Sequence, residues 1–389
     1  MIEIVTKQPE TGRGSSYELY DRIGRGLFDV LKPGVRNVKQ VSNLLWLVAA
    51  IVGGESIALS QIANLLPANA IAQSRVTRIR EWLKNSRVDV WALYRRVLER
   101  VLDGWNGADM VLIMDGTMVF HERLHIVRIS MAYGNRAFPL AWQVFIGTGL
   151  VSIDPLRPMV TRLADFLKPY AGRVTLYADR GFRDHNWAKL CMALGWGYRI
   201  RIARSTHIHL RTGAIVQLDA LKPRRFRTLC LCHAKLTDHG FGTHVTMTWS
   251  RGEGNQVPEL VIVMSDQPAH PDRLSEYSVR MDIEQSFRDD KSAGFNIDKT
   301  RLVHPERLER LLLAVAIATL WCHETGQFVL QGGEPLRRII DPGYTRSLSV
   351  FQLGLRWIKR CLAVTLNALP LFALCLRPHY SLPACMVKT

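Results

Sequence analysis

The apolar residues of segment 41–103 recur every three to four positions, which is the spacing of amphipathic helices. Two amphipathic stretches, 57–66 and 74–85, are separated by a short turn, and the second carries arginines off its apolar stripe. This arrangement is typical of a helix-turn-helix, although an ordinary solvent-exposed helix face has the same pattern. We expect an N-terminal all-helical domain over residues 1–105.

After Gly104 the pattern changes to apolar runs of strand length that alternate with helical segments. Strands are predicted at 110–114, 125–133, 138–146, 174–178 and 198–202, and helices at 154–170 and 184–194. The order β-β-β-α-β-α-β predicts an α/β fold, a mixed sheet flanked by helices, whose first part spans residues 106–200.

The remainder of the chain divides by composition into three parts. Residues 201–265 are rich in β-branched residues, with glycines as breaks, and predict a β-rich basic insertion. Residues 266–345 are mainly helical and are expected to complete the core, while 346–389 form a C-terminal helical region. The apolar run 311–322 is too short to cross a bilayer, so we expect a buried helix there and no membrane partner.

The formal net charge is +17, and it is spread over the whole sequence rather than concentrated in a tail. This favours a long polyanion such as nucleic acid as the partner. The seven cysteines are scattered, which indicates reduced thiols and a cytoplasmic location. The sequence Cys230-Leu-Cys232-His233 does not have the usual spacing of a zinc site, and no Gly-Lys-Ser/Thr phosphate loop points to ATP.

Three carboxylates occupy positions that suit chemistry. Asp115 follows the first predicted strand and Asp179 the fourth, so both emerge at one sheet edge if those strands are neighbours. Glu284 lies on the helix after the insertion. At 100° per residue, Tyr277, Arg280, Glu284 and Lys291 fall within a stripe of about 60°, which Arg288 borders. We expect this helix face to handle phosphate.

Three carboxylates with few neutralising neighbours are the ligand set that hard cations such as Mg²⁺ or Mn²⁺ prefer. Two such ions can activate an attacking oxygen and stabilise a leaving one during displacement at phosphorus. Arg280 and Lys291 are then expected to bind flanking phosphates, and Tyr277 to hydrogen-bond another. Any one of these acids alone is more often an ordinary solvated or salt-bridged residue.

Together, these residues resemble the DDE transposases of bacterial insertion sequences that carry a Tyr-x2-Arg-x3-Glu-x6-Lys signature. Tyr277, Arg280, Glu284 and Lys291 match that spacing without a gap. Asp115, in Met-Asp-Gly-Thr, looks like the first acid of the family, and Asp179, in Ala-Asp-Arg-Gly-Phe, like the second. The resemblance covers roughly residues 105–330 by motif and organisation.

The resemblance implies an RNase H-like core interrupted by the β-rich insertion, with Asp115, Asp179 and Glu284 as catalytic metal ligands. It implies that water attacks at the element end and that the freed 3′-OH then attacks target DNA. The implied partners are therefore the terminal inverted repeats and target DNA, and a homodimer is implied to hold two element ends. In such relatives a Trp of the insertion stacks on a flipped base, and Trp249 is the candidate here. Arg180, beside the second acid, and Arg288 are further expected DNA contacts.

Two other functions remain open from the sequence. A metal-dependent nuclease or resolvase of the same fold cleaves DNA without joining it to a target. The other is a DNA-binding protein derived from a transposase that has lost catalysis. The presence of all three acids and of the Tyr-Arg-Glu-Lys set argues against it. Asp184 and His185 lie close to the second acid, but a helix N-cap is the expected role of Asp184.

Overall fold

A computed structural model describes the chain except for residues 1–15, 67–70, 121, 134–135, 148–151, 226, 238–239, 251–257, 281–294, 298–300, 365–368, 375 and 377–389. By contact, the described residues fall into two compact units, one within residues 1–102 and 288–376 and the other within 103–287. Each unit is described by itself. The domain boundaries expected from the sequence stay predictions.

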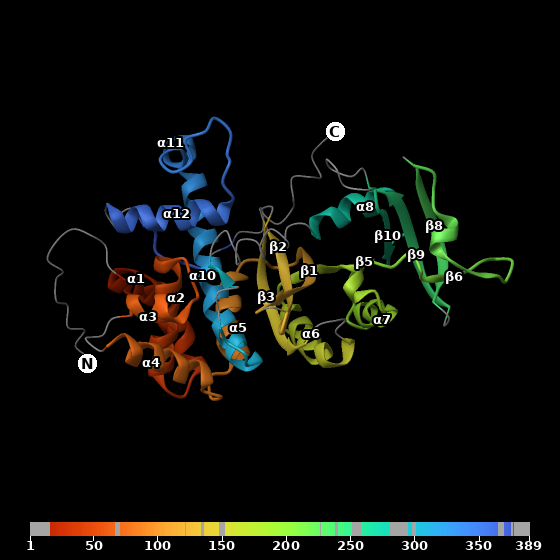
Figure 1. Cartoon of the computed structure of the whole chain (residues 1–389). Helices are drawn as coiled ribbons and strands as arrows, with labels where there is room; N and C mark the ends of the chain where they lie inside the picture. The colour runs from red at the N-terminus through yellow and green to blue at the C-terminus, as the bar shows by residue number, and fades with distance from the viewer. Residues whose placement is uncertain are drawn as a thin grey trace. The chain divides into compact units, whose positions relative to one another are not determined.

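The first unit is all-helical, as predicted for the N-terminal region. Its helices are α1 (Ser16–Leu31), α2 (Val38–Gly54), α3 (Leu59–Leu65), α4 (Ala72–Lys84), α5 (Val90–Val101), α10 (Pro305–Gln331), α11 (Gly333–Arg338) and α12 (Val350–Ala363), with a 3-10 turn, η1, at Lys32–Gly34. Figure 1 shows α1 to α5 in red and orange and α10 to α12 in blue. Side chains of Asn37, Asp89 and Ser349 cap the starts of α2, α5 and α12 by accepting backbone hydrogen bonds.

Helix α10 is the buried centre of this unit. Every residue from Leu311 to His323 is buried, so the predicted buried helix over 311–322 is confirmed. Among the residues described, α10 is the one helix long and apolar enough to cross a membrane, and 89% of its most apolar window is buried inside the structure. Two glycines let α10 and α12 meet closely, since a Cβ at Gly354 would overlap the carbonyl oxygen of Cys322 and one at Gly326 that of Val350.

The second unit is built on one ten-stranded mixed sheet of order β3-β2-β1-β4-β5-β10-β9-β8-β6-β7. The strands are β1 (Ala108–Val119), β2 (Leu124–Tyr133), β3 (Arg136–Ile146), β4 (Ala171–Ala178), β5 (Gly197–Arg201), β6 (His207–His209), β7 (Ile215–Gln217), β8 (Thr228–Leu236), β9 (Phe241–Trp249) and β10 (Leu260–Ser265). Its helices are α6 (Ile153–Leu167), α7 (His185–Ala193) and α8 (Asp272–Tyr277), with 3-10 turns η2 (Arg180–Phe182), η3 (Leu218–Leu221) and η4 (Ser278–Arg280). The predicted β-β-β-α-β-α-β order and the mixed α/β class are confirmed.

Strands β1, β4 and β5 run parallel at the centre of the sheet, and the strands on either side of them pair antiparallel. Residues 201–265 are β-rich, as predicted, and their strands extend the same sheet because β10 pairs antiparallel with β5. The name RNase H-like for this core stays a prediction.

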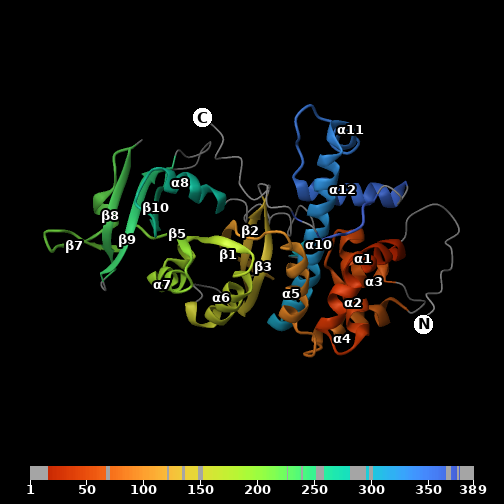
Figure 2. The same cartoon turned by 180° about the vertical axis from the view of Figure 1, so that it is seen from behind.

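The two faces of the sheet are covered by different helices. Figure 1 and Figure 2 show α6 and α7 together on one side and α8 on the other. Under α8, Ile113 of β1, Tyr177 of β4 and Val263 of β10 form a buried cluster with Tyr277 and Val279. Burial raises the pKa of Tyr177 to about 12. This cluster fixes the end of α8 over the central parallel strands.

Candidate active site

The two aspartates meet at one edge of the central strands, as predicted. Strands β1 and β4 are adjacent and parallel, and their pairing ends with Met114 opposite Ala178. Asp115 and Asp179 come directly after that last pair. The first acid does not end its strand, however, because β1 continues to Val119 through its antiparallel pairing with β2.

Strand register places a row of four charged residues across the face that α8 covers. Side chains alternate along a strand, so Asp115 and Asp179 lie on the same face as Ile113 and Tyr177, two positions earlier. In β5, Arg199 pairs with Tyr177, which puts Arg201 level with Asp179. In β2, Arg128 lies directly opposite Asp115. The row therefore reads Arg128, Asp115, Asp179 and Arg201.

Asp115 is held from two directions. Its Oδ2 lies 3.1 Å from Nη1 of Arg280, and its Oδ1 accepts a 2.8 Å hydrogen bond from the backbone N–H of Gly116. Only 14% of the Asp115 side chain and 10% of the Arg280 side chain are exposed. Arg128, on the same face, is also buried. The Arg280 guanidinium thus offsets the charge of this acid.

Asp179 has an oxygen that is buried without a partner among the residues that the structure describes. Its Oδ1 lies out of contact with solvent and accepts no hydrogen bond from them. A buried carboxylate oxygen in this state costs free energy unless another group occupies it, and a cation is the natural occupant. Among the residues described, no group of three His, Cys, Asp or Glu side chains is close enough to hold a metal ion. Glu284, the predicted third ligand, lies outside the described residues.

Tyr277 and Arg280 both point into the protein. The Tyr277 hydroxyl donates to the carbonyl of Ala178 at 3.3 Å, and Arg280 lies over the Tyr277 ring at 5.9 Å. Burial raises the pKa of the Tyr277 hydroxyl well above its ordinary value, and the charges of Asp179 and Asp115 add to this against those of Arg280 and Arg201. The phenol therefore stays protonated. Arg288 and Lys291, predicted on the same stripe, lie outside the described residues.

A buried ionic cluster supports the segment that carries Tyr277. Arg199, 2% exposed, pairs through Nη1 with Asp266 at 2.6 Å and through Nε with Glu276 at 2.9 Å. Burial alone would raise the pKa of Asp266, but hydrogen bonds from Gln267, the Tyr198 backbone and Arg199, with the Arg199 charge, hold it below its ordinary value. Glu276 precedes Tyr277, so this cluster fixes where the tyrosine enters the site.

Trp249 and Arg180 line one cavity beside the aspartates. The cavity has a volume of about 560 Å³ and is lined by residues that include Arg201, Arg204 and Glu259. The Trp249 ring is oriented by a 2.8 Å hydrogen bond from Nε1 to the carbonyl of Pro223. Arg180 follows Asp179 in the chain, and Arg201 lies level with Asp179 in the sheet. Since both arginines line the cavity, the cavity adjoins the Asp179–Arg201 end of the row of charged residues.

Sequence reasoning missed Arg128, Arg201 and Glu259. Arg201 was counted only as part of a basic cluster, and nothing local in the sequence distinguishes it from Arg204 or Arg211. The interpretation of Asp184 is confirmed, since its carboxylate accepts from the Asn186 N–H at the start of α7. The described cysteines differ in burial. Cys191, Cys322 and Cys361 are buried, whereas Cys230 and Cys232 are exposed.

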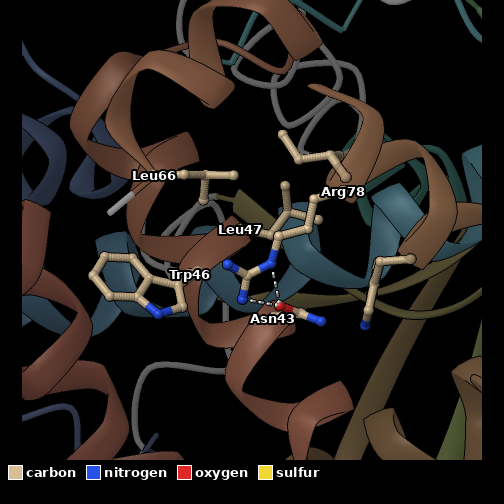
Figure 3. Close-up of a pocket in the computed structure, with 7 residues that line it drawn as sticks. Asn43, Trp46, Leu47, Leu66 and Arg78 are labelled. Atoms are coloured by element: carbon tan, nitrogen blue, oxygen red, sulfur yellow. Dashed lines mark hydrogen bonds between the residues drawn. The ribbon is translucent and has the colours of Figure 1, made fainter. Parts of the chain in front are cut away.

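In the helical unit, α3 and α4 form the pair predicted at 57–66 and 74–85. Figure 3 shows how α4 is fixed on α2, with the Arg78 guanidinium directed at Asn43. Arg78 donates to Asn43 Oδ1 from Nε at 3.1 Å and from Nη2 at 2.7 Å, and Trp82 Nε1 donates to the Gln40 carbonyl at 3.1 Å. The other side of α4 exposes polar and basic residues together with one acid: Gln73, Ser74, Thr77, Arg80, Glu81 and Lys84.

Three comparisons set this chain beside known proteins. A comparison with curated proteins finds no match. Among solved structures, a piggyBac transposase synaptic complex with hairpin DNA is similar at 11% identity, over 89% of this chain and 77% of that one, with a TM-score of 0.39. An Argonaute of Marinitoga piezophila with a 5′-OH guide RNA and target DNA is similar at 11% identity over 56% and 32%, with a TM-score of 0.22. At such scores neither likeness bears on activity.

The model of the family described as "Transposase DDE domain" matches residues 157–321. The matched segment contains Asp179, Tyr277 and Arg280, which the structure brings together, and the predicted third acid, Glu284. Over these residues the chain is similar to the transposase DDE domain, and the match supports a DDE transposase with DNA transposase activity.

Proposed function

We propose that this protein cleaves the ends of a bacterial insertion sequence and joins the freed 3′-OH to target DNA by two-metal phosphoryl transfer. One observation carries the proposal: Asp115 and Asp179 follow the last residue pair of two parallel neighbouring strands, and an oxygen of Asp179 is buried with no partner in the described part of the chain. The match to the transposase DDE domain agrees with it.

The donor set suits a divalent metal. DDE transposases generally use such ions, and carboxylate oxygens are the ligands that Mg²⁺ or Mn²⁺ prefers. Asp115, Asp179 and Glu284 would hold two ions. Asp179 Oδ1 would serve as one oxygen ligand, since it accepts no hydrogen bond from the described residues. When bound, the ions lower the pKa of the attacking water or hydroxyl and stabilise the leaving oxygen.

The surrounding cations balance the acids. Arg280 pairs with Asp115, and Arg128 lies opposite Asp115 in the strand register, so the site is not left with the full repulsion of neighbouring carboxylates before DNA enters. We propose that Arg280, with Arg288 and Lys291, also binds phosphates next to the cleaved bond. The protonated hydroxyl of Tyr277 donates a hydrogen bond and takes no part as a base.

The cavity beside the acids suits a displaced nucleotide. Its Trp249 side chain offers an aromatic face, and Arg180 and Arg201 supply positive charge at its wall. We propose that a base flipped out near the cleaved end stacks on Trp249 while Arg180 contacts the backbone.

The helical unit is proposed to bind the terminal inverted repeats. Helix α4 is packed firmly on α2 and presents polar and basic side chains on its free side, as a recognition helix does. A homodimer holding two ends, in the cytoplasm and at the nucleoid when bound to DNA, completes the proposal.

The test uses a labelled duplex with the end of the element, a supercoiled target plasmid, and Mg²⁺ or Mn²⁺. The wild type is expected to cut at the end and to join the product to the plasmid. Asp115→Asn, Asp179→Asn and Glu284→Gln should each abolish both steps, whereas Asp165→Asn, an exposed acid on α6, should retain them. Cutting without joining would favour a nuclease, and binding without cutting a DNA-binding derivative.

A further inference from the structure

One acid bridges two arginines that line the cavity. Oε1 of Glu259 lies 2.7 Å from Nη2 of Arg201 and 3.3 Å from Nη1 of Arg180. The backbone of Glu259 is fixed beside β9, because its N–H donates to Ser250 Oγ at 2.8 Å and its carbonyl accepts from the Ser250 N–H at 2.8 Å. The carboxylate is therefore held at the place where the two guanidinium groups converge.

The three side chains differ in exposure, and the difference decides which of them can move. The side chain of Arg201 is 15% exposed, whereas Glu259 is 53% and Arg180 is 61% exposed. A largely desolvated guanidinium needs an anion beside it, but an exposed carboxylate gains little from an ion pair that solvent screens. Arg201 thus requires a counter-ion, and Glu259 can leave at small cost if another anion takes its place.

A DNA phosphate is that other anion. A phosphate offers several oxygens to two guanidinium groups at once, while Glu259 presents one shared oxygen. We propose that Glu259 is a displaceable stand-in for a DNA phosphate: it holds Arg180 and Arg201 in position in the free protein, and a backbone phosphate replaces it when DNA enters the cavity. This inference rests on the proposed function, because it takes DNA as the ligand of the site.

The role of such an acid is to weaken binding of DNA in general. Every phosphate that reaches Arg180 and Arg201 must first displace a carboxylate, and it is repelled by that carboxylate while it does so. An element end that also places a base against Trp249 in the cavity gains binding free energy that offsets the displacement of Glu259. A duplex without such a base does not gain it. Glu259 therefore raises the preference for a correctly placed DNA end.

The test measures binding without catalysis. Anisotropy of a labelled duplex with the element end and of an unrelated duplex is followed in EDTA for the wild type, Glu259→Gln and the control Asp165→Asn. The control removes another exposed negative charge, which pairs with Lys168. Glu259→Gln should bind the unrelated duplex about 2- to 5-fold tighter, with a smaller gain for the element end. Asp165→Asn should change neither.

A second pair of variants separates a local effect from the loss of one charge. In an Arg180→Ala background, the gain from Glu259→Gln should shrink, because one of the two bridged arginines is gone. Arg180 is exposed, so its removal should not unfold the protein. Three results would each overturn the inference: an undiminished gain in that background, an equal gain for Asp165→Asn, or no gain for Glu259→Gln. All three would leave cleavage and joining by the wild type intact. Absence of DNA binding by the wild type would instead refute the proposed function.

Discussion

Arg280 Nη1 lies 3.1 Å from Oδ2 of Asp115, joining the turn after α8 to the central strand of the sheet. The sequence places Arg280 on a helix face expected to handle phosphate, and the structure shows it buried against the first acid of the site. The two roles are compatible only if the guanidinium that neutralises Asp115 also faces incoming DNA.

Arg280→Gln should therefore affect stability as well as cleavage. Removing the guanidinium leaves the largely buried Asp115 carboxylate without its closest cation, so the free energy of unfolding should fall by about 2–4 kcal/mol. Urea unfolding measures this change, and end cleavage should fall in parallel. An unchanged unfolding midpoint would mean that the pair contributes nothing to the fold.

The ionic cluster around Arg199 makes a prediction about acid stability. Because the folded-state pKa of Asp266 lies below its ordinary value of 3.8, its interactions stabilise the fold above that pH and are lost as the pH falls below it. Arg199→Met should lower the free energy of unfolding at neutral pH by about 3 kcal/mol and flatten the acid limb of the profile. A profile below pH 4 with the wild-type slope would contradict this account.

For Glu324, in the helical unit, we expect stability to depend on pH in the opposite direction. Burial raises its pKa from 4.5 to about 7, against the hydrogen bonds from the backbone N–H groups of Ala373 and Leu374 that favour the carboxylate. Since the folded protein holds the proton more tightly than the unfolded chain, this group makes stability fall as the pH rises from 4.5 to 7. Thermal unfolding of Glu324→Gln should lack this component, and its presence in the variant would assign it to another group.

The close approach of α10 and α12 is testable with a pair of glycine variants. A Cβ at Gly354 would overlap the Cys322 carbonyl, so Gly354→Ala should cost about 1–3 kcal/mol in unfolding free energy. Gly24, inside α1, has room for a Cβ beside Leu45, and Gly24→Ala should be neutral or slightly stabilising. Equal effects of the two substitutions would show that helix propensity, and not contact, decides the result.

Local patterns predicted the position of the aspartates well. Each acid follows a short apolar run, and parallel neighbouring strands bring such positions to one edge. The buried helix over 311–322 was equally predictable, and it lies inside α10. Helix α1 was missed, although Leu19, Ile23, Leu27 and Leu31 lie four residues apart on one buried stripe. Polar residues and glycines stand between these positions and obscure the spacing in the sequence.

Long-range pairing was beyond the sequence. Arg128 and Arg201 join the aspartates only because β2 and β5 flank β1 and β4 in a particular register. Glu259 reaches Arg201 because β10 lies beside β5. The spacing placed Tyr277 and Arg280 on one α-helix, but α8 ends at Tyr277 and Arg280 lies in the 3-10 turn η4. Spacing also does not tell whether a helix face meets solvent or the sheet, and here both residues are buried.

The central claim is that Asp179 is a metal ligand of a DNA-cleaving site, and metal rescue tests it most directly. Asp179→Cys replaces the oxygen ligand with a softer sulfur, which Mg²⁺ binds poorly and Mn²⁺ tolerates better. End cleavage by this variant should be lost in Mg²⁺ and partly restored in Mn²⁺, while Asp165→Cys should cleave in both. Cleavage by Asp179→Cys in Mg²⁺ at the wild-type rate would contradict the claim.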